Sequence, residues 1–396
     1  MSSQEIVLSL ERMNRIYNHP RQSEDDDDNQ ASTTNILRAD AGCILQDLQE
    51  FAAKEMDCLV PVDLGAKGTC QIGGNVSTNA GGVYYYRYGN SLSAEVLNLS
   101  FDPPPHLKDN TGYDLKQLFI GAEGTLGIIT KVALLCPPLP KSIGAVWLTC
   151  KSLQDVIQIM TLAKTKYLTE ILAAFEFMDS DVLDLVKETH GSSVKLPVDT
   201  TGGNDPCYSV LVETHGSNEE HDQDKLGIFL QCIMEKGLVT DGVVAQSLTQ
   251  VNEFWNARDM CNPAAAATGF VYKYDVSLAA IDFDNFIHEI KARLPDNDAL
   301  CVNWGHIIDG NLHCNVVSSG NFERDPEFAK LVDQSILEAV MKRDGSISAE
   351  HGLGQYKNNY LSRIKDGTTL QTMRQVKKLF DPHCILNPGK YLPKDG

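Results

Sequence analysis

The segment Val302–Val317 restricts the possible folds of this chain more than any other stretch. It contains two runs of apolar, β-favouring residues on either side of Asp309-Gly310. An Asp-Gly pair between two such runs is the strongest short-range signal for a β-hairpin with a two-residue turn. A turn at these residues would place His306 opposite His313, and directly opposed residues have Cβ atoms roughly 4.5–5.5 Å apart on one face. The hairpin therefore predicts two imidazoles that can bind one metal ion.

A second motif, Ser348–Gly354, supplies further candidates. It contains Glu350 and His351 beside glycines, which let the backbone approach a ligand closely. Two histidines and one carboxylate leave a position open on zinc, which is the pattern of a catalytic rather than a structural site. We therefore predict that His306, His313 and Glu350 bind zinc. The alternative is a hairpin whose two histidines are incidental.

The charge of the chain argues against several classes of partner. Its 34 lysines and arginines against 53 aspartates and glutamates give a net charge of −19, which disfavours binding to nucleic acid or anionic membranes. No apolar run approaches the roughly 20 residues of a membrane span. An anionic substrate would therefore need local cations, and Arg258 and Lys273 are the candidates that we would bring to the hairpin. For each of them the alternative is a surface ion pair.

The eleven cysteines include no Cys-x-x-Cys pair, which indicates reduced thiols that pack as small apolar residues.

The amino-acid composition and the hydrophobic pattern of the chain change near residue 140. Before it, six glycines lie among small polar residues in Pro61–Gly82, a composition that brings backbone N–H groups close to an anion such as a pyrophosphate. Neither a Rossmann nor a Walker A motif is present, and an ordinary glycine-rich loop is the alternative. After it, strands alternate with amphipathic helices, which predicts an α+β fold with an antiparallel sheet. We expect domains at 1–140 and 141–325, with a small helical segment at 326–396 that completes the active site.

Several motifs together resemble one family of flavoproteins. Gly73–Gly82 and Gly121–Thr130 are similar to the FAD-binding domain of the vanillyl-alcohol-oxidase/p-cresol-methylhydroxylase (PCMH) superfamily. Gly305–Asn315, Ser348–Gly354 and Asn387-Pro388-Gly389, together with Phe175–Met178, resemble its 2-hydroxyacid dehydrogenase branch, the FAD-binding oxidoreductase/transferase type 4 family. The resemblance implies that residues 1–140 form a partial PCMH-type FAD-binding domain.

The same resemblance implies an activity and partners. The reaction would be the oxidation of D-2-hydroxyglutarate, a small 2-hydroxy dicarboxylate, to 2-oxoglutarate. The cofactors would be FAD and Zn²⁺, and an electron-transfer flavoprotein would accept the electrons. A homodimer and a location in the mitochondrial matrix are also expected, although no transit peptide pattern is visible in the chain.

Residue roles follow from the resemblance position by position. His306, His313 and Glu350 become the zinc ligands, and His351 becomes the catalytic base and a substrate contact. The other substrate-binding residues are Arg258, Asn262, Lys273 and Asn315; the last of these lies two residues after His313 and so points to the same side of its strand. The FAD-binding residues are Gly73, Gly74, Asn75, Thr78, Asn79, Gly82, Glu123, Gly127, Ile128, Ile129 and Asn387.

The chain departs from the family pattern at three points that bear on function. Between Leu97 and Lys108, the short segment Ser100–Leu107 replaces an expected strand, Asp-Gly turn and strand. Asn262 occupies a position where the family has a substrate-contacting threonine. The first half of the family's FAD domain is expected to be absent before Met1. Rival interpretations are a D-lactate dehydrogenase of the same family, a metal-dependent hydrolase without flavin, and a truncated form without FAD and without activity.

Overall fold

The structure is a computed structural model that describes residues 6–17, 35–89, 92–96, 111–198, 207–295 and 299–393. It divides the chain into two compact units, which are described separately here. Unit 1 joins Met1–Leu139 to Glu350–Gly396, and unit 2 is Pro140–Ala349. Residues 326–349, assigned from the sequence to a separate C-terminal segment, therefore belong to unit 2.

Unit 1 is built on a four-stranded antiparallel sheet with the strand order β1-β2-β4-β3. Its core gathers Leu37 and Ala39 of the second strand, Leu48 of the first helix and Ile72 of the second helix, all fully buried. The elements of this part are β1 (Ile16–Tyr17), β2 (Ile36–Asp40), α1 (Leu45–Met56), α2 (Ile72–Thr78), α3 (Tyr85–Tyr88), β3 (Leu92–Val96), a 3₁₀ turn (Leu115–Leu118) and β4 (Ile129–Leu135).

The C-terminal part of unit 1 is helical, as predicted. It consists of a 3₁₀ turn (Asn358–Tyr360), α11 (Leu361–Ile364) and α12 (Gly367–Phe380). The ring of Phe380 packs edge-on against Phe119 with 5.1 Å between centroids. Lys377 donates to the carbonyl oxygens of Thr125, at 2.7 Å, and Leu386, at 2.9 Å. The end of α12 is thus part of the same core as the described residues of β2, α1 and α2.

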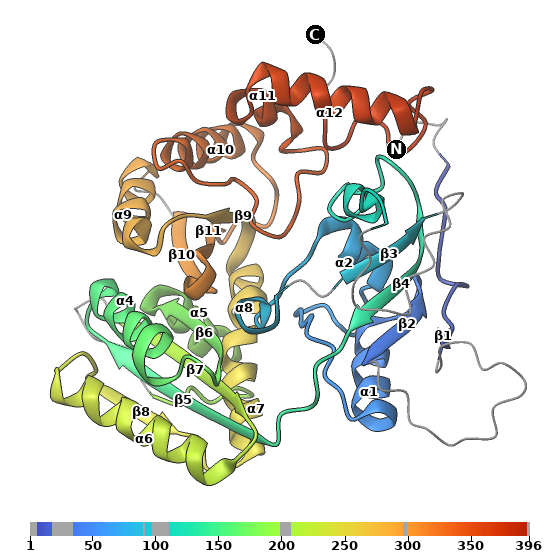
Figure 1. The fold of residues 1–396 in the computed structure, drawn as a ribbon. Helices are drawn as coiled ribbons and strands as arrows, with labels where there is room; N and C mark the ends of the chain where they lie inside the picture. Colours follow the sequence, from blue (N-terminus) through green and yellow to red (C-terminus); the bar gives the residue numbers. More distant parts are fainter. Residues whose placement is uncertain are drawn as a thin grey trace, which may run out of the picture. The chain divides into compact units, whose positions relative to one another are not determined.

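Unit 2 contains a seven-stranded antiparallel sheet with the order β8-β5-β7-β6-β10-β11-β9 (Figure 1). The antiparallel sheet predicted for this part of the chain is confirmed. The strands are β5 (Ser142–Cys150), β6 (Leu172–Asp179), β7 (Tyr208–Gly216), β8 (Asp241–Val244), β9 (Gly269–Ser277), β10 (Ala299–Gly305) and β11 (Asn311–Ser319).

Helices cover both faces of this sheet. On one face, α5 (Ser180–His190), α7 (Leu248–Asp259) and α8 (Cys261–Thr268) share a core with Trp147 and Trp304. The other face packs against α4 (Leu153–Leu162, continued by a π-turn at Ala163–Tyr167), α6 (Glu219–Glu235), α9 (Phe283–Arg293, after a 3₁₀ turn at Ala280–Asp282) and α10 (Pro326–Met341). No helix in the described part of the chain is long and apolar enough to cross a membrane.

The hairpin that dominates the sequence forms, but its turn differs from the prediction. A 3₁₀ turn at Ile307–Asp309 and Gly310, in the left-handed region at φ +83°, connect β10 to β11. His313 is therefore opposite Trp304 rather than His306. The predicted two-residue turn is wrong because the 3₁₀ turn takes Ile307 and Ile308, both buried, out of the strand ladder.

Asp179 caps α5 from inside the core and gives a testable pH dependence. Its carboxylate accepts from Val182 N at 3.0 Å and from Asn303 Nδ2 at 2.8 Å. Burial, and next the like charge of Asp181, raise the pKa of Asp179 from 3.8 to about 6. A carboxyl whose pKa is higher in the folded state favours folding when protonated, so this contribution is complete below pH 4 and is lost as the pH rises through 6.

We expect the stability of the wild type, measured against Asp179→Asn, to fall by about 3 kcal/mol between pH 4 and pH 7, because two pKa units correspond to roughly that free energy. Urea unfolding of both proteins at several pH values measures it. If the difference in free energy of unfolding between the wild type and Asp179→Asn did not change with pH, the prediction would be wrong.

Candidate active site

The two histidines of the hairpin lie in contact despite the altered turn. His306, directly after β10, and His313, in β11, are 4% and 8% exposed. Their ring centroids are 5.5 Å apart and their planes are nearly perpendicular, at 80°. Asn311 N donates to the His306 carbonyl oxygen at 3.2 Å, which fixes the backbone of His306 at the end of the ladder. Two buried imidazoles this close form a donor set suited to a divalent metal such as zinc.

A buried carboxylate supports His306 from the neighbouring strand. Glu176 in β6 is 0% exposed, and its Oε1 accepts a hydrogen bond from His306 Nδ1. Burial alone would raise the pKa of Glu176, but the charges and hydrogen bonds of His306 and Arg258 outweigh it and lower the pKa to about 2. The carboxylate is therefore ionised at all ordinary pH values. A histidine that donates Nδ1–H to a carboxylate has an unprotonated Nε2 when the ring is neutral, which is the usual arrangement around protein-bound metals.

The second oxygen of the same carboxylate holds Arg258, near the end of α7. Glu176 Oε2 lies 2.9 Å from Arg258 Nε and 2.7 Å from Nη2. The arginine side chain is only 12% exposed, and its Nη1 is 3.4 Å from the carboxylate of Asp259. Arg258 was predicted to be either a substrate cation or part of a surface ion pair. It is part of an ion pair, but a buried one, whose carboxylate also contacts a predicted zinc ligand.

Asp275 in β9 occupies a similar position beside His313. It is fully buried and opposite His313 in the sheet, with Oδ1 3.8 Å from His313 Nδ1. Asn311 Nδ2 donates to the same oxygen at 2.6 Å. The Asp275 carbonyl oxygen accepts from Ala349 N at 3.2 Å. The chain therefore leaves unit 2 beside this strand, and Glu350 is the next residue.

Of the other predicted substrate residues, Asn315 and Lys273 are directly opposed on neighbouring strands. Asn315 is buried, whereas Lys273 is exposed and forms no ion pair with any residue that the structure describes. Asn262 is exposed in the first turn of α8, a helix that packs against β9 and β11.

The predicted residues from Ser348–Gly354 are described within unit 1. Glu350 is partly buried, and its Oε2 accepts from Gly82 N at 3.2 Å, while His351 is exposed. The structure thus places one predicted zinc ligand, Glu350, against the glycine-rich segment. The set His306, His313 and Glu350 remains a prediction.

Part of the glycine-rich segment, Ile72–Thr78, forms helix α2. Gly73 N donates to the Ala41 carbonyl oxygen at 2.8 Å, and a Cβ at Gly73 would lie 2.6 Å from the Ala41 Cβ. Gly73, Gly74, Asn75 and Thr78 lie within α2, and the backbone N–H groups of Gly74 and Asn75 bond to Gln71. Gly73 therefore serves close packing, and these amide groups are not free to bind an anion as the sequence suggested.

Other features of this segment do fit a bound flavin. The Oδ1 atom of Asn75 is buried and accepts no hydrogen bond from the described residues, and Gly74 is open on its side-chain side. Asn79 and Gly82 both have positive φ angles, +57° and +77°, which turn the chain back after the helix. A buried polar atom without a partner is costly unless a ligand or water satisfies it.

Glu123 connects the other predicted FAD residues to the C-terminal part of unit 1. Its carboxylate accepts from Leu353 N at 2.6 Å and from Gly354 N at 2.7 Å. Asn387 Nδ2 donates to the Glu123 carbonyl oxygen at 2.5 Å. The remaining predicted FAD residues, Gly127, Ile128 and Ile129, lead into β4.

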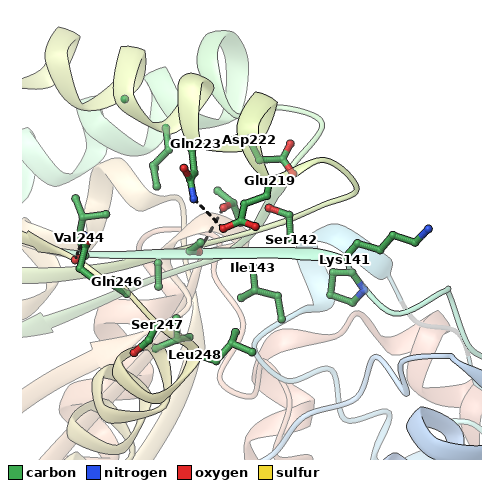
Figure 2. A pocket seen from close by; sticks show the side chains of 18 of the residues that line it. Lys141, Ser142, Ile143, Glu219, Asp222, Gln223, Val244, Gln246, Ser247 and Leu248 are labelled. Carbon is green, nitrogen blue, oxygen red and sulfur yellow. Dashed lines mark hydrogen bonds between the residues drawn. The ribbon is translucent and has the colours of Figure 1, made fainter.

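A cavity of about 600 Å³ lies elsewhere in unit 2. It is lined by the start of β5 with residues from α6, β8 and the beginning of α7, and Figure 2 shows Glu219 and Gln223 hydrogen-bonded above it. These strands form the sheet edge opposite to β9 and β11. None of the predicted site residues lines it, and its only lysine, Lys141, faces away from the labelled carboxylates in Figure 2.

Comparison with known proteins assigns the chain to a family. Residues 139–391 match the family of FAD linked oxidases, C-terminal domain, and residues 1–99 match an FAD binding domain. The mitochondrial D-2-hydroxyglutarate dehydrogenase of Arabidopsis thaliana is 41% identical over 398 residues, which cover 98% of this chain and 67% of that protein. The chain belongs to the D-2-hydroxyglutarate dehydrogenase family of FAD-linked oxidases. A second member of this family, from Bos taurus, is 40% identical over 98% of this chain and 69% of its own length.

Membership in this family confirms several expectations from the sequence. The chain is an FAD-dependent dehydrogenase that acts on a hydroxyacid, and the mitochondrial localisation agrees with that of the relatives. The solved structure of p-cresol methylhydroxylase with substrate bound matches with a TM-score of 0.68 over 97% of this chain and 79% of that one, at 14% identity. This likeness confirms the PCMH-type fold. The chain spans about two thirds of the length of the curated relatives.

Two acidic residues near the histidine pair, Glu176 and Asp275, were not predicted from the sequence to have a role. Glu176 lies between two phenylalanines in β6, and Asp275 lies between Tyr274 and Val276 in β9. Charged residues are almost never fully buried unless they are paired, so an acidic residue between aromatic or aliphatic neighbours in a strand was the available signal.

Proposed function

We propose that this chain oxidises D-2-hydroxyglutarate to 2-oxoglutarate and passes the electrons to FAD. The observation that carries the proposal is the arrangement of His306 and His313, whose rings contact each other while Glu176 holds His306 Nδ1. This arrangement supports metal binding by His306 and His313, in which each histidine offers its outer nitrogen. Glu350 is the third ligand that the family resemblance implies. When bound, FAD supplies the two-electron acceptor, and zinc supplies a Lewis acid for the substrate hydroxyl.

The remaining steps belong to side chains of this chain. His351 would accept the proton of the 2-hydroxyl group at an imidazole nitrogen, since histidine is the most frequent general base. Asn315 offers an amide that can hold the 2-hydroxycarboxylate, and Asn262 offers a second amide at the start of α8. Oxidation then removes the C2 hydrogen with its electron pair, and the carbonyl of the 2-oxoacid forms.

D-2-Hydroxyglutarate carries a second carboxylate, distal to the 2-hydroxyl group. Recognition of this distal carboxylate distinguishes the proposed enzyme from a D-lactate dehydrogenase. Lactate lacks that carboxylate, and a chain with a net charge of −19 repels a dianion unless cations lie close to its binding site. Lys273 is exposed, has no ion-pair partner in the described part of the chain, and lies opposite Asn315. We assign the distal carboxylate to Lys273, with Arg258 adding the N–H groups that Glu176 leaves open.

The test is a comparison of kcat/KM for D-2-hydroxyglutarate and D-lactate with FAD present. A hydrogen bond between charged groups contributes about 1.5–3 kcal/mol, so we expect a preference for hydroxyglutarate of roughly ten- to a hundredfold. Lys273→Met should remove most of that preference, whereas Lys330→Met, at an exposed lysine of α10, should leave it unchanged. Equal kcat/KM values for the two substrates in the wild type would favour the lactate assignment.

The electron acceptor and the assembly are also proposals. We propose that an electron-transfer flavoprotein reoxidises the FAD and that the chain forms a homodimer, and both rest on the family resemblance.

A further inference from the structure

The strongest unexplained feature of unit 2 is the carboxylate of Glu176. It lies in a strand whose eight residues are all buried, and it is itself 0% exposed. Burying an ionised carboxylate is costly unless partners compensate the charge. Glu176 has two partners, one on each oxygen, and they come from parts of the chain 130 and 82 residues away. Both partners, His306 and Arg258, belong to the predicted site.

The first consequence concerns the proton on His306. Glu176 is held ionised by Arg258, so it can only accept at Oε1, and His306 Nδ1 must carry the hydrogen. A neutral imidazole with its proton on Nδ1 has an unprotonated Nε2. Without the carboxylate, the ring could place its proton on Nε2 instead, and this tautomer cannot bind a metal through that atom.

The second consequence concerns the plane of Arg258. Its Nε and Nη2 both approach the single oxygen Oε2, at 2.9 and 2.7 Å. A guanidinium is rigid and planar, so contact along one edge fixes the direction of its other N–H groups. The same carboxylate therefore sets the orientation of a metal ligand and of a substrate cation.

We propose that Glu176 is a positioning residue of the active site: one carboxylate that fixes the metal-binding tautomer of His306 and the orientation of Arg258 together. This proposal rests on the proposed function, because it needs the metal site that includes His306. It assigns to Glu176 a role beyond stabilising the core.

Replacement of Glu176 by glutamine is informative because an amide cannot satisfy both partners. If the amide turns its oxygen to His306, its NH₂ group faces the guanidinium, which has only donors. If it turns its NH₂ group to His306, the imidazole must accept at Nδ1 and carry its proton on Nε2. Removal of the donors at position 258 as well should release this conflict, so the double variant Glu176→Gln/Arg258→Met can keep the oxygen on His306.

The matched control is Glu213 in β7, on the next strand and the same face. It is also buried and bonded to a histidine, with His215 Nε2 2.6 Å from Oε1, and Trp255 Nε1 donates to its other oxygen. Neither partner belongs to the predicted metal site. Glu213→Gln therefore removes an equivalent buried charge without touching His306.

The experiment measures Zn²⁺ affinity of the full chain after removal of bound metal, by competition with a chromophoric chelator, alongside circular dichroism. We expect Glu176→Gln to weaken Zn²⁺ binding by about ten- to a hundredfold, the usual effect of losing the partner of a ligating histidine. Glu176→Gln/Arg258→Met should recover most of the affinity, and Glu213→Gln should equal the wild type.

Each outcome decides between the proposals. Wild-type affinity in Glu176→Gln overturns the role of Glu176, as does an equal loss in Glu213→Gln. If Glu176→Gln does not fold, the double variant decides: unimpaired folding with weak Zn²⁺ binding overturns the proposal, and near-wild-type binding supports it. A wild type that binds no Zn²⁺ overturns the proposed function and this inference with it.

Discussion

Replacement of His306 by glutamine is expected to lower kcat/KM for D-2-hydroxyglutarate by about a thousandfold. A metal that polarises the substrate hydroxyl contributes several kcal/mol to transition-state stabilisation, and about 4 kcal/mol corresponds to that factor. Glutamine keeps a polar side chain that can reach Glu176, so the fold should survive. Steady-state kinetics with FAD present, together with the bound zinc content, measure the effect.

The control for this variant is His215→Gln. His215 is also buried and also bonded to a glutamate, Glu213, but it lies two strands from the hairpin. It should lose stability without losing zinc or comparable activity. Two results would contradict the prediction: wild-type kcat/KM in His306→Gln without bound metal, or a loss of kcat/KM in His215→Gln as large as that in His306→Gln. Either would show that the reaction does not depend on a metal held by His306.

Arg258→Ala is expected to reduce the free energy of unfolding by about 3–5 kcal/mol, as is typical when one partner of a buried ion pair is removed. The loss arises because Glu176 keeps its burial but retains only His306 as a partner. Lys273→Ala should change stability by less than about 0.5 kcal/mol, since this lysine is exposed and makes no ion pair that the structure describes. Urea unfolding monitored by circular dichroism distinguishes the two.

Both substitutions should also lower kcat/KM for hydroxyglutarate by roughly ten- to a hundredfold. The two variants should therefore lose similar activity but differ in stability, because Arg258 is buried in the core whereas Lys273 is at the surface. Equal stability of Arg258→Ala and Lys273→Ala would show that the buried pair with Glu176 does not form in solution.

The sequence predicted the fold best where local signals were strong. The hairpin at Val302–Val317 follows from its two β-favouring runs, and the chain division near residue 140 follows from the change in composition. The turn was wrong because Asp309-Gly310 is compatible with two connections. The 3₁₀ turn is chosen by burial of Ile307 and Ile308, which depends on contacts that no local pattern reveals.

The candidate site shows the same limit. The histidine pair is local, since its members are seven residues apart, and it could be predicted from the hairpin alone. Glu176 is 130 residues from His306, and their contact depends on the order β6-β10-β11, which the sequence does not state. At Gly73 the local pattern was misleading. The glycine-rich composition around this residue indicated anion binding, whereas the structure requires a glycine here because a side chain would collide with Ala41.

The division of the chain has a consequence for synthesis. Unit 2 is one continuous stretch, Pro140–Ala349, whereas the core of unit 1 needs Phe380 and Lys377 from its second segment. Domains generally fold as units as they leave the ribosome. Unit 2 can therefore reach its final form while unit 1 is still waiting for its last segment, although the first part of unit 1 is made earlier. During that interval Phe119 lacks the ring of Phe380 as a packing partner, so unit 2 is completed before unit 1 although the first segment of unit 1 is translated earlier.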